Sequence, residues 1–110
     1  DNMITYIKEA QIKLNYSIAI KQASDLENVA NDLEQMICTS LQNGVEELSA
    51  SWKGESSNRF ISKENELEQQ IRSTARELRQ TARTVRTIAR NIYNTEMNNV
   101  RIARAMLMGL

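Results

Sequence analysis

The chain has 110 residues, of which 41% are hydrophobic and 25% charged, with no histidine, no proline and one cysteine. This composition indicates one folded domain rather than a disordered chain, and a lone cysteine excludes an internal disulfide. The formal net charge is zero, but residues 22–68 hold ten acids against three bases, whereas residues 69–110 hold eight arginines against two acids. A chain folded back on itself would place these two segments side by side.

The first half of the chain has the pattern of one long helix. Spacings of four and three alternate along a row of apolar and small residues: Ile12, Tyr16, Ala19, Ala23, Leu26, Ala30, Leu33 and Ile37. This heptad pattern is typical of a helix that packs along a neighbour. A second apolar stripe, formed by Ile4, Ile7, Leu14 and Ile18, indicates a second neighbour. We predict an uninterrupted helix near residues 4–50.

The segment LSASWKGESSNRF, residues 48–60, predicts a turn near residues 52–57. Gly54 can take a positive φ without steric cost, so the first helix can stop there and the chain can reverse. Glu55 would then favour the start of the second helix, and Ser56, Ser57 and Asn58 could cap its open amides. Phe60 is expected to meet Trp52 or Leu48 across the turn.

The second half of the chain predicts a helix near residues 58–106. Its apolar seam again alternates four and three: Leu67, Ile71, Thr74, Leu78, Thr81, Val85, Ile88, Ile92, Thr95, Asn99, Ile102 and Met106. Beside the seam runs a row of small residues with a seven-residue period, Ala75, Ala82 and Ala89, resumed at Ala103. We expect this alanine row to pack against a second chain. Ile102, Met106 and Leu107 are expected to extend beyond the first helix.

Two helices of this length do not shield their wide apolar faces from water. The expected fold is therefore all-α, a single domain over residues 1–110, in which an antiparallel two-helix hairpin dimerises into a four-helix bundle. The partner would be a second copy of the chain or a related hairpin.

Six arginines follow one another at spacings of four and three: Arg72, Arg76, Arg79, Arg83, Arg86 and Arg90. This spacing predicts one outward ridge opposite the apolar seam. Three interpretations are open: a solvated face partly answered by acids of the first helix, a docking ridge for an acidic protein partner, or a nucleic-acid contact line. The lack of interleaved aromatic residues counts against nucleic acid.

Two long helices joined at Trp-x-Gly resemble the WXG family, the ESAT-like small proteins of bacterial type VII secretion. The residues that carry the resemblance are Trp52, Gly54 and, six residues after the glycine, Phe60. The resemblance implies a hairpin that dimerises and is secreted from the bacterial cytoplasm without a cleaved signal peptide. It also implies action as an effector or as a targeting partner for a larger secreted toxin, in contact with the secretion ATPase. The N-terminal segment has no apolar core of signal-peptide length.

The family's export signal resembles a tyrosine followed four residues later by an acid, near the end of the second helix. Here Tyr93 is followed by Glu96 at the third position, whereas Ile92 and Glu96 meet a looser pattern in which a bulky apolar residue replaces tyrosine. Alternatively, Ile92 is a seam residue and Glu96 a solvated acid. The departure suits a protein that travels with a partner carrying the signal.

Catalysis is not expected, because the chain has no histidine and no glycine-rich phosphate loop. Glu64, Glu66 and Glu68 are spaced by two residues, which scatters them around a helix. The sequence therefore predicts no enzyme activity, no cofactor, no metal and no small-molecule substrate. The alternative to a secretion role is a helical dimeric scaffold or a nucleic-acid-associated protein that uses the arginine ridge.

Overall fold

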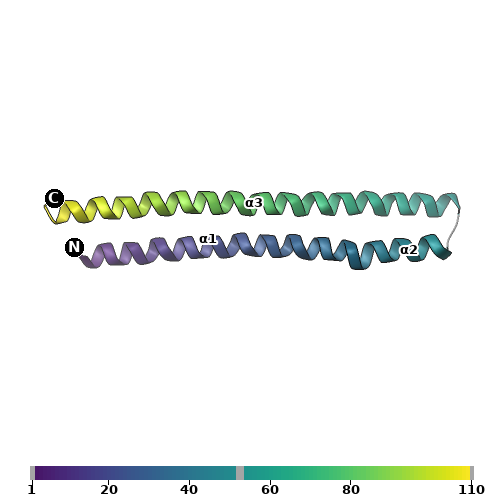
Figure 1. The fold of residues 1–110 in the computed structure, drawn as a ribbon, viewed down its shortest axis with the longest axis horizontal. Helices are drawn as coiled ribbons and strands as arrows, with labels where there is room; N and C mark the ends of the chain where they lie inside the picture. Colours follow the sequence, from purple (N-terminus) through teal and green to yellow (C-terminus); the bar gives the residue numbers. More distant parts are fainter. Residues whose placement is uncertain (1, 52–53, 110) are drawn as a thin grey trace. The chain divides into compact units, whose positions relative to one another are not determined.

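The computed structural model describes residues 2–51 and 54–109, without the side chains of Asn2 and Ser51. Its elements are α1 (Asn2–Met36), the π-helix η1 (Ile37–Leu41), α2 (Gln42–Ser51) and α3 (Glu55–Leu107) (Figure 1). No strand occurs among the described residues, so the expected all-α class is confirmed. The long helices follow from the heptad patterning and the absence of proline, the strongest helix breaker. No described helix combines the length and apolar character that crossing a membrane requires.

The uninterrupted first helix expected from the sequence contains a π-helical segment. The apolar residues around this segment are spaced by four residues three times in succession: Leu33, Ile37, Leu41 and Val45. In an α-helix, each spacing of four residues turns about 40° past a full turn. A π-helix is underwound, because its hydrogen bonds join residues five apart, and so it offsets this drift. The amide of Gln42 accordingly donates to the carbonyl of Ile37, whose side chain is fully buried.

The described chain divides into two compact units. Unit 1 comprises residues 1–25 and 81–110, and unit 2 comprises residues 26–80. The expected single domain over residues 1–110 stays a prediction, and each unit is described by itself.

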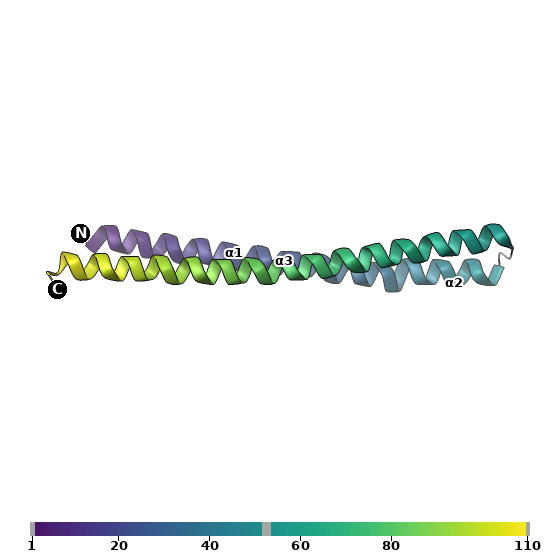
Figure 2. The same ribbon diagram turned by 90° about the horizontal axis from the view of Figure 1, so that it is seen from above.

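In unit 1 the N-terminal part of α1 runs antiparallel to the C-terminal part of α3 (Figure 2). The rings of Tyr16 and Tyr93 lie 5.0 Å apart between their centres, with their planes at 47°. Nη2 of Arg104 donates to Oε1 of Glu9 at 2.7 Å. The side chains of Ile102, Met106 and Leu107 are 51%, 73% and 60% exposed, as expected of an overhang. The pairing of Arg104 with Glu9 shows, however, that α1 still lies beside α3 as far as Arg104, so the overhang does not begin at Ile102.

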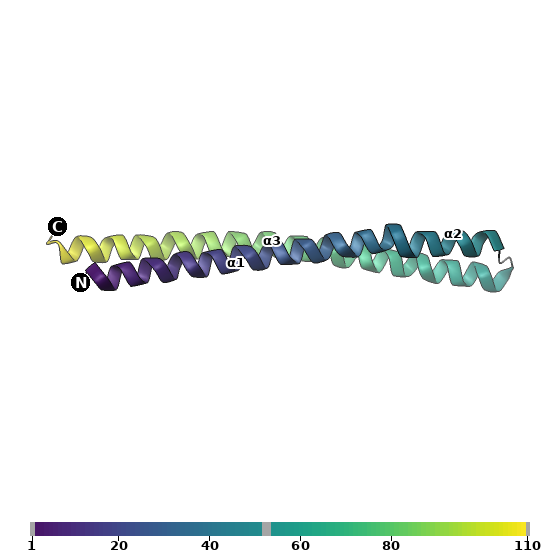
Figure 3. The same ribbon diagram turned by 90° about the horizontal axis from the view of Figure 1, so that it is seen from below.

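In unit 2 the C-terminal part of α1, together with η1 and α2, runs alongside the N-terminal part of α3 (Figure 3). Nε2 of Gln42 donates to Oε1 of Glu68 at 3.1 Å, which ties α2 to α3. Two side chains donate to backbone carbonyls at η1, Thr39 to Gln35 at 2.9 Å and Asn43 to Thr39 at 2.7 Å. The side chains therefore supplement the backbone bonding where the helix changes type.

Small residues form the centre of the helix contact in both units. Ala75 and Ala82 of α3 are fully buried in the single chain, and so are Ala23 and Ala30 of α1. Ala89 is also buried, with 8% of its surface exposed. The expectation that the alanine row of α3 packs against a second chain is therefore wrong. Alanines on both helices allow close approach, so the row is covered within the hairpin itself.

The turn between α2 and α3 includes Gly54, whose φ is +124°. The backbone amide of Asn58 and the hydroxyl of Ser57 both donate to the carbonyl of Gly54, at 3.1 and 2.8 Å. Ser57 is 2% exposed and holds this carbonyl, which differs from the amide cap expected of it. Glu55 opens α3, three residues before the expected start, and lies in its first turn.

Of the other turn-motif residues, Trp52 lies outside the described residues, so its expected packing stays a prediction. Phe60 is 41% exposed. Its ring is thus only partly covered at this end of unit 2.

Candidate interaction surfaces

Two arginines of α3 lie on the side that faces α1. In unit 2 the Arg79 guanidinium donates to both carboxylate oxygens of Glu34, and its Nη2 also donates to Oδ1 of Asn31 at 2.7 Å. In unit 1, Nη2 of Arg86 donates to Oγ of Ser24 at 3.4 Å. Because a two-point guanidinium–carboxylate pair is directional, Arg79 and Glu34 fix the register of α1 against α3 in unit 2.

The charges of this pair stabilise each other. The hydrogen bond from Arg79 lowers the pKa of Glu34; desolvation acts in the opposite direction, and the positive charges of Arg79, Arg72 and Arg76 add to the lowering. The same hydrogen bond raises the pKa of Arg79. Both groups are therefore ionised at neutral pH, and their attraction is lost only in acid.

Arg72 is the third arginine of this heptad-spaced set. Its Nη2 donates to Oε1 of Glu68 at 3.0 Å, one turn earlier in α3. The same carboxylate oxygen accepts the hydrogen bond from Gln42 of α2. Arg72 thus helps to hold Glu68 in position for its hydrogen bond with Gln42 of α2.

The remaining three arginines of the predicted ridge, Arg76, Arg83 and Arg90, are exposed. They form no hydrogen bond or ion pair with the part of the chain that the structure describes. The expectation that all six arginines point outward is therefore wrong for Arg72, Arg79 and Arg86. Each of these lies four residues before an exposed arginine, which is about 40° round the helix, so its long side chain reaches the groups beside α1 and α2.

The three residues of the predicted export signal lie on one continuous helix, α3, within unit 1. The ring of Tyr93 packs on Tyr16, whereas Ile92 is 51% exposed. Glu96 is half-buried and borders the same hollow as Ile92. Because residues three and four apart are neighbours on a helix, Glu96 lies beside both Tyr93 and Ile92, and all three line a hollow next to α1. Of the two candidates for the bulky residue, Ile92 is the exposed one, whereas the ring of Tyr93 is engaged with Tyr16.

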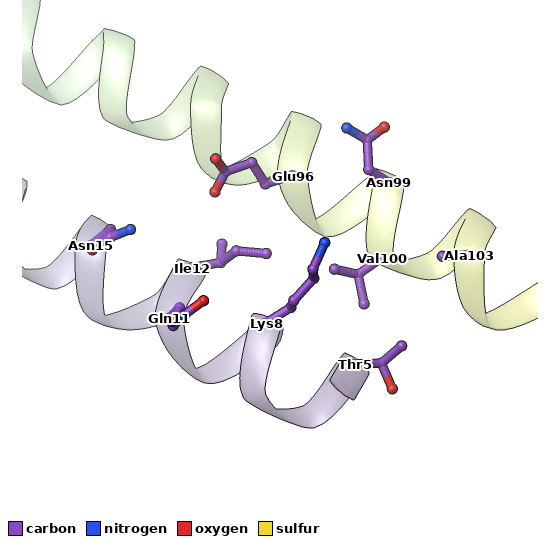
Figure 4. A pocket seen from close by; sticks show the side chains of 9 residues that line it. All are labelled: Thr5, Lys8, Gln11, Ile12, Asn15, Glu96, Asn99, Val100 and Ala103. Carbon is purple, nitrogen blue, oxygen red and sulfur yellow. The ribbon is translucent and has the colours of Figure 1, made fainter. Parts of the chain in front are cut away.

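A groove of about 330 Å³ lies between α1 and α3 in unit 1 (Figure 4). Its walls combine one cation, one anion, amides and apolar groups: Thr5, Lys8, Gln11, Ile12, Asn15, Glu96, Asn99, Val100 and Ala103. The charges of Lys8 and Glu96 do not form an ion pair with each other in this part of the structure. The groove can hold polar side chains by hydrogen bonding to its amides and charged groups.

The comparison with protein families settles what kind of hairpin this is. The family model for proteins of 100 residues with WXG matches residues 11–97, which is most of the chain. The chain belongs to the WXG100 family. None of the curated proteins and none of the solved structures compared matches it.

WXG100 proteins are ESAT-like proteins of type VII secretion, and the helical hairpin found here is the fold of the family. They are secreted through type VII systems and typically form hairpin dimers. They are not known as enzymes. The family assignment predicted from Trp52, Gly54 and Phe60 is thus confirmed.

Sequence reasoning missed the groove in unit 1. Lys8 and Asn15 were not singled out, and Asn99 was counted only as a seam residue. One signal was available, since Asn99 is the one amide in a row otherwise made of apolar residues and threonines. The seven-residue spacing of Lys8 and Asn15 also places them on one side of α1.

Proposed function

We propose that this WXG100 protein is secreted by a bacterial type VII system and works by protein–protein contact, as a targeting partner for a larger toxin or as an effector. The family match over residues 11–97 carries the proposal. The targeting role is supported by Tyr93, whose ring packs on Tyr16 and which lacks an acid four residues later. A chain with an incomplete signal of its own suits export together with a partner.

The partner hairpin, we propose, packs on the apolar row of α3, with a four-helix bundle as the product. In unit 1 the part of this row proposed for the partner comprises Ile88 and Ile102, which are 52% and 51% exposed. Unit 1 also presents the second apolar stripe of α1: Ile4, Ile7, Leu14 and Ile18, between 46% and 59% exposed. A helix with apolar groups on more than one side needs more than one neighbour, and burying these groups supplies the driving force for association.

The export feature proposed for this chain is the pair Ile92 and Glu96. The exposure of Ile92, four residues before the half-buried Glu96, supports this choice over Tyr93, whose ring packs on Tyr16. A recognition surface on folded helix also agrees with a carrier that exports helical hairpins.

The test measures secretion in a bacterium with a type VII system, with and without its secretion ATPase. Ile92→Ala and Glu96→Ala should each lower the amount in the culture supernatant. The control Asn94→Ala, at an exposed position of α3 outside the hollow that Ile92 and Glu96 border, should not. Circular dichroism checks that all three variants remain helical. Truncation after Tyr93 is unsuitable, because it removes the buried Val100 and the Arg104 contact to Glu9. Equal, ATPase-dependent secretion of all variants would contradict the assignment of the signal.

A second experiment tests the partner face by light scattering. Ile88→Glu should dissociate the dimer, formed alone or with a co-expressed related hairpin. The control Ser17→Glu introduces the same charge at an exposed polar position of α1 and should not. A wild-type chain that stays monomeric alone and with such a hairpin would refute the four-helix bundle.

The alternative of a nucleic-acid-associated scaffold rested on six outward arginines. Three of them are engaged by groups of the hairpin, so we do not favour it. The remaining exposed arginines require a separate explanation.

A further inference from the structure

One face of α3 in unit 1 carries three exposed arginines, Arg83, Arg90 and Arg101, which we call the outer arginine row. At 100° per residue, Arg90 lies within about 20° of Arg83, and Arg101 lies five full turns beyond Arg83. The row is therefore straight and about 27 Å long, with exposed Thr87 and Asn94 between its members.

No acidic side chain among the described residues forms an ion pair with the outer arginine row. Arg83 and Arg90 make no ion pair, and Arg101 donates only to the amide oxygen of Asn98, at 2.5 Å. No acid occurs in α3 between Glu77 and Glu96. Unit 1 as a whole holds eight lysines and arginines against four acids, so it offers no surplus of negative charge.

The row is separate from the face proposed for the partner hairpin. Ile88 follows Arg83 by five residues, which places it about 140° round the helix. A hairpin packed on the apolar row of α3 would therefore leave the outer arginine row accessible. A second partner with complementary charge has room to bind there.

We propose that the outer arginine row binds an acidic α-helix of another protein. Arg83 and Arg90 are about 10.5 Å apart along the axis, which is the repeat of acids seven residues apart on a helix lying alongside. Nucleic acid fits less well, because the row is one side chain wide and has no aromatic residue for stacking. A membrane surface fits less well, because Thr87 and Asn94 provide no apolar groups to insert.

The test uses a labelled helical peptide with glutamate at every seventh position and a second peptide of the same composition with its glutamates scattered around the helix. Fluorescence anisotropy at low salt measures the binding of each peptide to the full chain. The double variant Arg83→Gln/Arg90→Gln removes two charges from the row. The control Lys13→Gln/Lys21→Gln removes two charges from α1 of the same unit, and circular dichroism checks that both variants stay helical.

We expect the wild-type chain to prefer the heptad-spaced peptide. The arginine double variant should bind it roughly 2- to 30-fold more weakly, the range expected for two exposed ion pairs. The lysine double variant should change binding less than twofold, and added salt should weaken the wild-type complex. The proposal is overturned by equal losses in both double variants, by equal binding of the two peptides, or by no peptide binding at all. It is also overturned if a 20-base-pair DNA duplex binds more tightly than the peptide, or if sedimentation shows self-association that only the arginine variant loses.

Discussion

Replacing Ala82 with leucine tests whether the alanine row is an internal contact of the hairpin. Ala82 is fully buried in the single chain, as are Ala75 of the same row and Ala23 of α1. Three added carbon atoms find no space there, so they must push the helices apart. Overpacking of this kind costs about 1–3 kcal/mol. For a domain near this size, that loss lowers Tm by roughly 4–24 °C.

The assay is thermal unfolding followed by circular dichroism, with every protein at the same chain concentration, because dimerisation makes Tm depend on concentration. Thr84→Leu is the control: it adds an apolar side chain at an exposed position of the same helix. The measurement is repeated at a tenfold lower concentration. A Tm for Ala82→Leu within about 2 °C of the wild type would refute internal packing of this row. If the Tm difference between Ala82→Leu and wild type disappeared at the lower concentration, the alanine row would instead belong to a dimer interface.

Three further outcomes follow from single positions. Gly44→Ala should raise the free energy of unfolding by about 0.5–1 kcal/mol, measured in urea, because a Cβ there meets nothing within 4 Å and glycine weakens a helix. Gly54→Ala should lower it by about 1–3 kcal/mol in the same assay, since its φ of +124° strains any residue with a Cβ; an unchanged urea midpoint would contradict this turn. Glu34→Gln should destabilise the protein at neutral pH, because the pKa of Glu34 is lowered by Arg79. The difference in the free energy of unfolding between Glu34→Gln and wild type should reach its full size above the ordinary pKa of 4.5. It should disappear as the pH falls through the lowered pKa of Glu34, and a difference that persists in strong acid would refute an ionic origin.

The proposed contact surfaces were only partly predictable from the sequence. Periodicity placed Arg83 and Arg90 on a common face of the second helix. It did not distinguish them from Arg79, which lies four residues before Arg83 and about 40° away. Only the tertiary positions of Glu34 beside Arg79 and of Ser24 beside Arg86 distinguish these paired arginines from the exposed ones. The export residues are similar, since spacing grouped Ile92, Tyr93 and Glu96, while the contact with Tyr16 separates Tyr93 from the other two.

By itself the sequence determined the helical class, the turn at Gly54 and the family, because these depend on local properties: apolar period, freedom from proline, and a glycine free to adopt positive φ. It did not determine which heptad row of α3 is covered. The alanine row and the isoleucine-rich seam have the same period, so both satisfy the pattern of a packed helix. The tertiary structure decides between them through close approach: Ala30 and Ala75 are both fully buried within the single chain, while Ile88 and Ile102 remain half exposed.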